Sequence, residues 1–372
     1  MRQKILLVML VAFCWSSFSQ DKNAQKDSSS VAHKKERKKF RYNFVPLPTY
    51  DPSTKFGLSV VNLFTYYLNM NDTISPASSG GVGAQFTTNG SWVIGGGNTL
   101  YLNEDRWRLT GQVIYGRINQ ELDLDFETIT DAKRIFSVVN LQALRKIYKR
   151  LYFGLGYSYR KVDYEGRDDL SQEQLEMRGL TAGEGNHGVR YLLTQDKREN
   201  VNYPYKGYYL GLRTEQYFAN ETSTDYMAHY VDFRHYINLS KRRGKEMIAY
   251  RVLMRFLTGD PQGQNYAYYG RTGGDIERGY ETGQYIDKHL LNMEAEYRLE
   301  TKLLKEKLGF IGLAGIGKVY GDYLSFDDAS WLPVIGVGAR YRLLPYERMN
   351  IRFDATLGKE GFVVYFGIRE AF

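Results

Sequence analysis

The last twelve residues, 361–372, alternate between apolar and more polar side chains with a period of two and stop on a terminal phenylalanine. Phe366, Ile368 and Phe372 share the apolar phase, whereas Arg369 lies in the opposite phase. A strand with this pattern has one face suited to lipid and another suited to a wetter interior. Outer-membrane β-barrels end in this way, so we interpret Phe366, Ile368 and Phe372 as a C-terminal assembly signal.

The same alternation recurs in segments further upstream. This recurrence matters because one alternating strand alone could equally belong to a soluble β-sandwich. Phe353 stands against Asp354, and Tyr297 stands against Glu296, so charged residues fall consistently in one phase. The chain contains 32 Tyr, 19 Phe and 37 Gly beside only 8 Pro, with a mean hydropathy of -0.47. A transmembrane barrel has this balance, because every second strand residue faces water and tyrosine gathers at the membrane interfaces. A secreted soluble β-sandwich is the alternative.

The N-terminus predicts export from the cytoplasm. Residues 1–4 carry two positive charges, residues 5–13 are apolar, and residues 17–19 offer small side chains around a cleavage site. Residues 1–19 are therefore predicted to be a signal peptide, which would also remove Cys14, the only cysteine. No later segment has the ~20 consecutive apolar residues that a membrane-spanning helix needs.

A basic segment follows the signal peptide. Residues 20–41 hold eight Lys or Arg and three acidic residues, with almost no apolar side chains. This composition predicts a disordered periplasmic tail ahead of a barrel domain at 42–372. We favour a solubilising leader over an electrostatic tether to anionic lipid or to an acidic partner.

Sixteen strands account for the remainder of the chain, and a fourteen-strand barrel stays open as an alternative. The predicted strands are 41–48, 56–69, 79–89, 91–103, 106–119, 132–147, 149–164, 186–195, 206–219, 225–240, 245–259, 285–299, 306–320, 331–343, 348–358 and 361–372. With both termini in the periplasm, the connections sort by length. Short periplasmic turns fall at 148–150, 241–244 and 344–347, and long outer loops fall at 120–131, 165–185 and 260–284.

The loop between the eleventh and twelfth strands contains Arg278, Gly279 and Tyr280. In this tripeptide and its place in the strand count, the chain resembles the BamA/TamA superfamily of outer-membrane assembly and secretion barrels. Residues 193–210 and 292–299 also match the family's pattern. The resemblance implies a sixteen-stranded barrel in which this loop folds inward and its arginine pairs with the wall.

The wall partner of Arg278 is predicted to differ from the usual one. The family places an aspartate where this chain has Gly315, so the inward-facing Glu294 and Glu296 are the candidate partners. Strand 1 contains Pro46 and Pro48, which donate no ladder hydrogen bond. Two interpretations of these prolines stay open: a weak seam between the first and last strands, and an ordinary barrel edge.

The resemblance also implies a function: protein insertion into the outer membrane or translocation across it, with unfolded outer-membrane or secreted proteins as clients. The family's assembly members carry periplasmic POTRA domains, and none fits into residues 20–41. A separate periplasmic protein or lipoprotein partner is therefore expected to supply them. The alternative is a non-catalytic barrel subunit or a passive channel.

Nothing in the sequence predicts an enzyme. No Gly-x-Ser-x-Gly motif occurs, and His229 and His235 would lie roughly 20 Å apart on one strand, too far to share a metal. The glycines at 95–97 have no helix after them to bind phosphate. We therefore expect no catalytic residue, metal, cofactor or nucleic acid. The expected location is the outer membrane of a Gram-negative cell, in contact with its lipids.

Overall fold

The computed structural model describes residues 39–51, 54–123, 129–177, 179–181, 183–221, 224–240, 246–270, 277–281, 285–345 and 348–372. The predicted signal peptide and residues 20–38 of the predicted tail lie outside these ranges. The chain divides into two units, Met1–Arg37 and Lys38–Phe372, and the second unit is described below. Phe40, which the prediction assigned to the tail, begins the first strand, one residue before the predicted start at Arg41.

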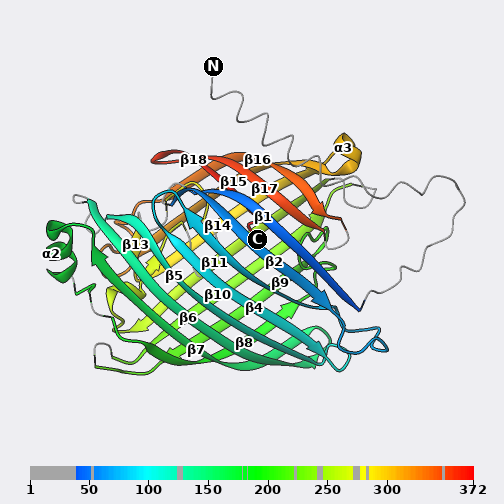
Figure 1. Ribbon diagram of the computed structural model, residues 1–372, viewed down its shortest axis with the longest axis horizontal. Coiled ribbons are helices and arrows are strands. Elements are labelled where there is room, and N and C mark those ends of the chain that lie inside the picture. Colours follow the sequence, from blue (N-terminus) through cyan, green and yellow to red (C-terminus); the bar gives the residue numbers. More distant parts are fainter. Residues whose placement is uncertain are drawn as a thin grey trace, which may run out of the picture. The chain divides into compact units, whose positions relative to one another are not determined.

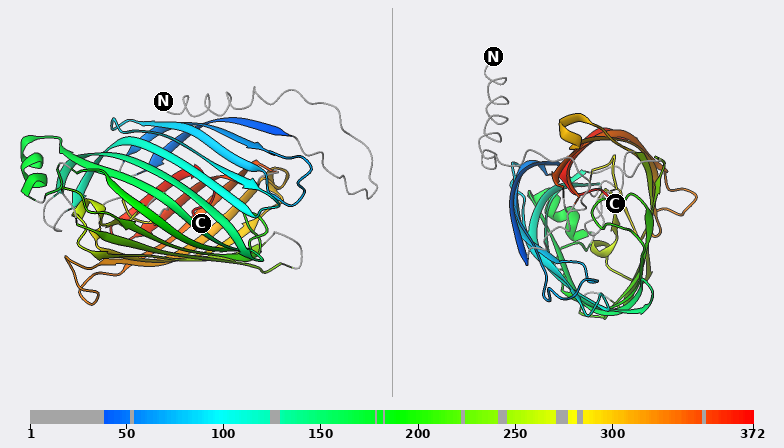
Figure 2. Two further views of the ribbon diagram at one scale, coloured as in Figure 1. Left: turned by 90° about the horizontal axis from the view of Figure 1, so that it is seen from below. Right: turned by 90° about the vertical axis from the view of Figure 1, so that its right-hand side faces the viewer.

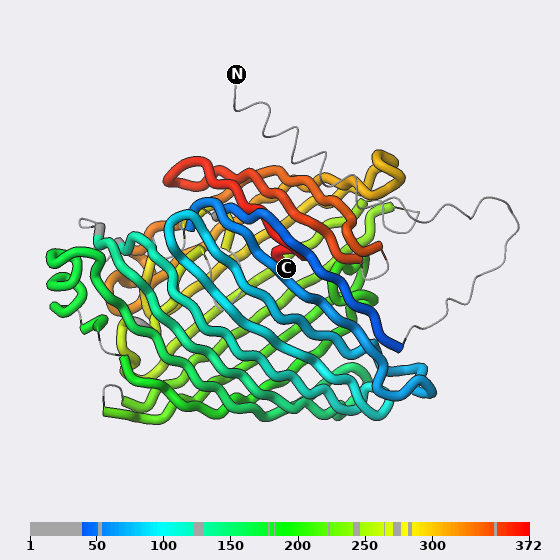
Figure 3. Tube along the Cα trace, in the orientation of Figure 1, coloured from blue at the N-terminus to red at the C-terminus, as the bar shows by residue number. Residues whose placement is uncertain are grey.

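One antiparallel sheet of sixteen strands forms the barrel wall, in simple sequence order (Figure 1). Its strands are β1 (Phe40–Asp51), β2 (Lys55–Tyr66), β3 (Ser78–Thr87), β4 (Trp92–Leu102), β5 (Trp107–Asp123), β6 (Ile129–Tyr148), β7 (Leu151–Gly166), β8 (Asn186–Asp196), β9 (Gly207–Tyr217), β10 (Tyr226–Asn238), β11 (Glu246–Gly259), β14 (His289–Glu300), β15 (Leu308–Tyr320), β16 (Leu332–Leu344), β17 (Met349–Gly358) and β18 (Gly361–Ile368). The strands cross the barrel obliquely (Figure 3), and the end-on view in Figure 2 shows the wall curving from β1 round to β18. The all-β barrel and its sixteen strands are confirmed, and fourteen strands are excluded.

Five smaller elements lie in the connections. They are α2 (Asp169–Met177), α3 (Leu303–Glu306), the 3-10 turn η1 (Gly263–Asn265) and the two-residue strands β12 (Ala267–Tyr268) and β13 (Ile286–Asp287). β12 and β13 pair with each other inside the long connection between β11 and β14. The twelfth barrel strand therefore begins at His289, four residues later than predicted. Among the described residues, no helix has both the length and the apolar character needed to cross a bilayer.

Period-two alternation decides which side chains face the lumen. On β14, Tyr297 is 45% exposed on the outer face, whereas its neighbour Glu296 is 1% exposed. On β7, Phe153 and Leu155 face outward and Tyr152 is buried inside. Successive strand residues point to opposite faces, and an outward charge at mid-bilayer costs about 2–4 kcal/mol. The predicted phase, with charges inward, is therefore the observed one.

The two ends of the barrel carry different connections. In Figure 1, α2 lies at one end and α3 at the other. Because the strands alternate in direction, the connections after β6, β10 and β16 fall at the α3 end, and those after β5, β7 and β11 fall at the α2 end. This is the sorting by length that the sequence predicts, and in that prediction the α2 end is the outer one.

Candidate functional site

The connection between β11 and β14 brings a charged tripeptide into the barrel. Arg278 and Glu277 each have 0% of their surface exposed, and Tyr280 has 1%. Arg278 donates from its backbone N–H to Glu294 Oε1 at 3.1 Å, which fixes the main chain of the loop as well as its side chain. A buried guanidinium requires acceptors on all sides, so the loop tip can rest only where the wall supplies them.

Three carboxylates of the wall supply those acceptors. Arg278 lies 2.6 Å from Glu294, 2.6 Å from Glu296 and 3.3 Å from Asp354. Glu294 and Glu296 face inward from β14, and Asp354 faces inward from β17. Burial alone would lower the pKa of the Arg278 guanidinium, but the three carboxylates hold it well above its usual value. The cation therefore stays charged and ties the loop to two separated strands.

Further arginines balance the same carboxylates. Arg298 lies 2.5 Å from Glu296, Arg340 lies 2.6 Å from Asp354 and from Glu370, and Arg352 lies 3.5 Å from Asp354. The cluster, which we call the Arg278 network, thus contains four guanidiniums and four carboxylates. Its members are Arg278, Arg298, Arg340, Arg352, Glu294, Glu296, Asp354 and Glu370. Pairing of opposite charges makes their burial tolerable, and removing one member of such a pair costs about 3–5 kcal/mol.

Gly279 and Tyr280 seat the tip by backbone contacts. Gly279 has a φ of +94°, and a Cβ there would lie 2.6 Å from a methyl group of Val334, so only glycine fits. The Tyr365 hydroxyl accepts hydrogen bonds from the N–H groups of Gly279 at 3.0 Å and Tyr280 at 3.2 Å. The Tyr280 hydroxyl donates to the Pro333 carbonyl at 2.7 Å. The tripeptide therefore contacts β16 and β18 as well as β14 and β17.

The last four residues do not belong to the final strand, which the sequence predicted to run to residue 372. β18 ends at Ile368, because Arg369 takes a left-handed φ of +69° and turns the chain away from the sheet. Phe366 and Ile368 keep the outward phase, but Phe372 is only 5% exposed and lies inside the barrel. Its ring lies 5.7 Å from the Arg278 Cζ and 5.4 Å from the Arg298 Cζ, and its carbonyl accepts from Arg298 at 3.2 Å.

This inward turn places the C-terminus against the Arg278 network. The role of Phe366, Ile368 and Phe372 as an assembly signal stays a prediction.

The seam between the first and last strands is not zipped. β1 and β18 stand at the two ends of the strand order, and no backbone ladder joins these two fully described strands. The Lys39 carbonyl accepts a hydrogen bond from the Tyr67 N–H, which follows β2. The backbone N–H and C=O groups of odd-numbered residues in β1 therefore point toward β2, and those of even-numbered residues point toward β18. Pro46 and Pro48 therefore remove donors from the edge that faces β18.

The architecture of this chain is similar to that of several solved structures. No protein-family model and no curated protein matches the sequence. Among solved structures, BamA from Haemophilus ducreyi lacking POTRA domains 1-3 matches with a TM-score of 0.57 and 12% identity, over 89% of this chain and 70% of that one. The chain has a BamA-type barrel fold. CdiB from Escherichia coli matches with a TM-score of 0.61 and 11% identity, over 90% of this chain and 63% of that one.

CdiB from Acinetobacter baumannii matches with a TM-score of 0.57 and 12% identity, over 90% of this chain and 60% of that one. The chain thus covers less than two thirds of the length of either CdiB structure. The resemblance to BamA-type barrels expected from Arg278, Gly279 and Tyr280 is confirmed for the fold.

A cavity of about 1020 Å³ borders the seam of this BamA-type barrel. Gly81, Gly97 and Gln112 line its wall from β3 to β5, and Arg41 and Arg369 line it at the seam. Glycines, uncharged polar side chains and aliphatic side chains make up most of this wall, in contrast to the charged wall around Arg278. Small side chains leave room inside the barrel beside the unzipped edge.

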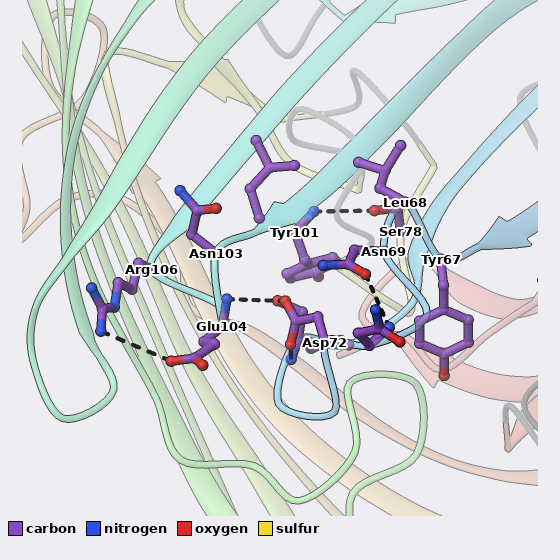
Figure 4. A pocket seen from close by; sticks show the side chains of 13 residues that line it. Tyr67, Leu68, Asn69, Asp72, Ser78, Tyr101, Asn103, Glu104 and Arg106 are labelled. Atoms are coloured by element: carbon purple, nitrogen blue, oxygen red, sulfur yellow. Dashed lines mark hydrogen bonds and ion pairs between the residues drawn. The ribbon is translucent and has the colours of Figure 1, made fainter.

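A second pocket, of about 470 Å³, lies at the α3 end between the β2–β3 and β4–β5 turns (Figure 4). Asp72 accepts from the Glu104 N–H at 3.0 Å and so ties one turn to the other. Hydrogen bonds to Asp72 hold the pKa of its carboxyl well below its usual value. Leu68 and Ile74 beside this contact are 54% and 60% exposed. The turns therefore form a fixed surface with apolar side chains in solvent.

Sequence reasoning missed several contacts of the Arg278 network. It placed Asp354 in the phase of the charged residues without assigning it to Arg278, and it did not include Arg352 or Glu370 among the partners. The missed signal is that β17 carries the inward pattern Arg352, Asp354 directly beside the last strand. Conversely, Glu294 and Glu296 lie where the prediction put them, against Arg278. Gly315 pairs with Glu294 across β14 and β15, and a Cβ there would lie 2.8 Å from the Glu294 side chain.

Proposed function

We propose that this chain is an outer-membrane barrel that inserts proteins into the outer membrane or translocates them across it. The observation that carries the proposal is the unzipped seam. β1 and β18 form an edge-to-edge boundary without a ladder, and two prolines on β1 weaken its hydrogen-bonding edge. An unpaired strand edge is a template on which another strand can pair. A client strand would gain there the hydrogen bonds that the seam lacks.

The loop network supports this proposal because it stiffens the wall next to the seam. Arg278 joins β14 to β17, and the tip contacts Tyr365 of β18 itself. A barrel whose last strands are held from inside can leave its seam unpaired without losing the whole sheet. The BamA-type fold and the Arg278, Gly279 and Tyr280 tripeptide point the same way. No step of the proposal needs a catalytic residue or a cofactor.

A partner protein at the α3 end belongs to the proposal. The surface formed by the β2–β3 and β4–β5 turns offers Leu68, Met70 and Ile74 to solvent, next to the pocket in Figure 4. Exposed apolar side chains on a fixed surface favour protein contacts. A periplasmic protein or lipoprotein that delivers clients would bind here, at the end where β1 starts and β18 stops.

Depletion of the protein tests the proposed function. Quantitative mass spectrometry of outer-membrane fractions should show a several-fold fall in other β-barrel proteins before growth slows. The control is a strain with a second copy of the gene that carries silent substitutions, so that the protein stays present during the depletion treatment. An unchanged outer-membrane proteome after full depletion would exclude insertion and translocation, and would leave a passive channel or a structural subunit as the function.

A further inference from the structure

The turn between β14 and β15 presents leucine and lysine side chains at one end of the barrel. It comprises residues 301–307, contains α3 and is called the α3 turn below. Leu303 and Leu304 are 54% and 62% exposed, and Lys302 and Lys305 are exposed on either side of this pair. Figures 1 and 2 show α3 projecting from the outside of the wall, at the end opposite to α2. The turn therefore stands beside the outer face of the barrel.

The lysines of the α3 turn have no acidic partner within the part of the chain that the structure describes. Neither Lys302 nor Lys305 has a side-chain hydrogen bond or ion pair there, and Glu306 has none either. Lys307 has only a cation–π contact, with its Nζ 6.0 Å from the centre of the Tyr341 ring. Three lysines and one glutamate give the turn a net charge of +2. The positive charge is thus available to a ligand.

The backbone of the α3 turn is held in a left-handed conformation. Residues 304–306 have φ angles of +48°, +59° and +64°, which are unfavourable for residues that carry a Cβ. Residues 103–105 have the same run of positive φ angles, but there Asp72 and Ser75 of the next turn accept hydrogen bonds from two of the N–H groups. Residues 304–306 receive no such bond from a neighbouring turn within the described ranges. A contact outside the chain can supply the stabilisation that these neighbours do not.

Lipid is the neighbour of the α3 turn on the outer face. Tyr297, Phe310 and Tyr341 are exposed there on β14, β15 and β16, and Tyr341 pairs with Leu308, the first residue after the turn. Aromatic side chains gather at the boundary between the hydrocarbon and the headgroups. The α3 turn continues this lipid-facing surface at the level of the headgroups. At that depth, leucine side chains are buried in the boundary, and lysine ammonium groups reach the phosphates.

We propose that the α3 turn is a membrane-surface anchor that binds anionic phospholipid headgroups. Leu303 and Leu304 enter the boundary between headgroups and acyl chains, and the three lysines bind the phosphate. A net charge of +2 favours an anionic headgroup over a zwitterionic one. In the predicted orientation of the barrel, the leaflet concerned is the periplasmic one. The inference rests on the membrane location of the barrel, and not on the proposed role in insertion or translocation.

Lipid binding to the delipidated full-length protein in detergent tests the headgroup preference. Native mass spectrometry gives the apparent dissociation constants of phosphatidylglycerol and phosphatidylethanolamine with identical acyl chains. Phosphatidylglycerol should bind about five- to thirtyfold more tightly, which is the effect of one to two lysine charges at a membrane surface. The triple substitution Lys302→Gln, Lys305→Gln and Lys307→Gln should remove most of this preference. Equal binding of the two lipids to the unmodified protein would overturn the proposal.

A matched triple substitution at the same end of the barrel separates a local site from a general effect of charge. Lys149→Gln, Lys197→Gln and Lys206→Gln remove the same charge from exposed positions on the β6–β7 and β8–β9 turns. This variant should keep most of the preference for phosphatidylglycerol. An equal loss in both triple variants would refute the assignment to the α3 turn. Heat-modifiable gel mobility reports whether each variant is folded, and Lys305→Gln alone replaces the first triple if that variant is not.

A fluorescent label tests whether the leucines lie in lipid. Leu304→Cys introduces a single cysteine into the mature chain, because Cys14 lies in the predicted signal peptide. After reconstitution into vesicles, phospholipids with brominated acyl chains should quench the label nearly as strongly as a label at Tyr297→Cys on the lipid-facing wall. A label at Glu104→Cys, on a rim side chain that is 57% exposed, should be quenched much less. If brominated lipid does not quench the label at Leu304→Cys, the turn faces the periplasm, and the occupant of this surface is a protein instead of lipid.

Discussion

Replacing Arg278 with methionine should release the loop tip from the barrel wall. The substitution removes the cation from three carboxylates, but two of them keep other partners. Glu296 retains Arg298 at 2.5 Å, and Asp354 retains Arg340 at 2.6 Å. Glu294 loses the ion pair at 2.6 Å that it makes with Arg278. One buried carboxylate therefore becomes uncompensated, which costs about 3–5 kcal/mol.

The lost stabilisation should shift the equilibrium of the loop from the seated toward the opened state. At 1.36 kcal/mol for each factor of ten, it corresponds to a roughly hundred- to several-thousand-fold rise in the opening equilibrium. Amide hydrogen exchange at residues 278–280 measures this directly, because these three N–H groups donate to Glu294 and to the Tyr365 hydroxyl. The double substitution Arg278→Met with Glu294→Gln should restore most of the protection, since it removes the stranded charge.

Arg352→Met is the matched control within the same network. Its contact with Asp354 is 3.5 Å long, and Asp354 keeps both Arg340 and Arg278 after the change. Exchange at 278–280 should then change by less than tenfold. If the two single substitutions accelerate exchange equally, or if Arg278→Met leaves it unchanged, the loop is not held by charge pairing and the reasoning fails.

Three further substitutions test the contacts around the tip by the free energy of unfolding in lipid vesicles. Gly279→Ala should destabilise the protein by about 1–3 kcal/mol, because the φ of +94° and the 2.6 Å approach to Val334 both exclude a side chain. Gly312→Ala, where a Cβ meets nothing within 4 Å, should cost far less, and equal losses would refute the argument. Tyr365→Phe should cost about 1–3 kcal/mol for each buried N–H that it leaves without an acceptor; a neutral result would show that these bonds are dispensable. Phe372→Ala should cost about 3–5 kcal/mol, since its ring is 5% exposed. A cost below 1 kcal/mol would place that ring in the lipid instead.

Strand alternation made most of the barrel predictable. Inward Glu296 and outward Tyr297 follow from a two-residue period that the lipid enforces on every strand. The same period placed Glu294 and Glu296 on the inner wall, where a loop arginine needs acceptors. The strand count then assigned Arg278 to the loop between the eleventh and twelfth strands, and the family resemblance implied that this loop folds inward to the wall.

Contacts across the lumen could not be predicted in the same way. Asp354 lies 76 residues from Arg278 in the chain, and their meeting depends on the curvature of the wall and the path of the loop. The inward turn of the C-terminus depends on a left-handed φ at Arg369, and arginine has no local preference for that conformation. The phase of Phe372 was wrong for this reason: the strand pattern continues in the sequence after the strand itself has ended.

The central claim is that the seam between β1 and β18 is the working part of the barrel. The predicted signal peptide contains Cys14, the only cysteine, so cysteine pairs introduced along outward positions of β1 and β18 report on the seam alone. The decisive measurement is whether a disulfide-locked pair, selected from a small panel that includes Tyr42→Cys with Ile368→Cys, supports outer-membrane protein assembly in a depletion strain. The account predicts that the oxidised protein fails and that reductant restores it, with single-cysteine variants active throughout. Full activity of the locked barrel would contradict it.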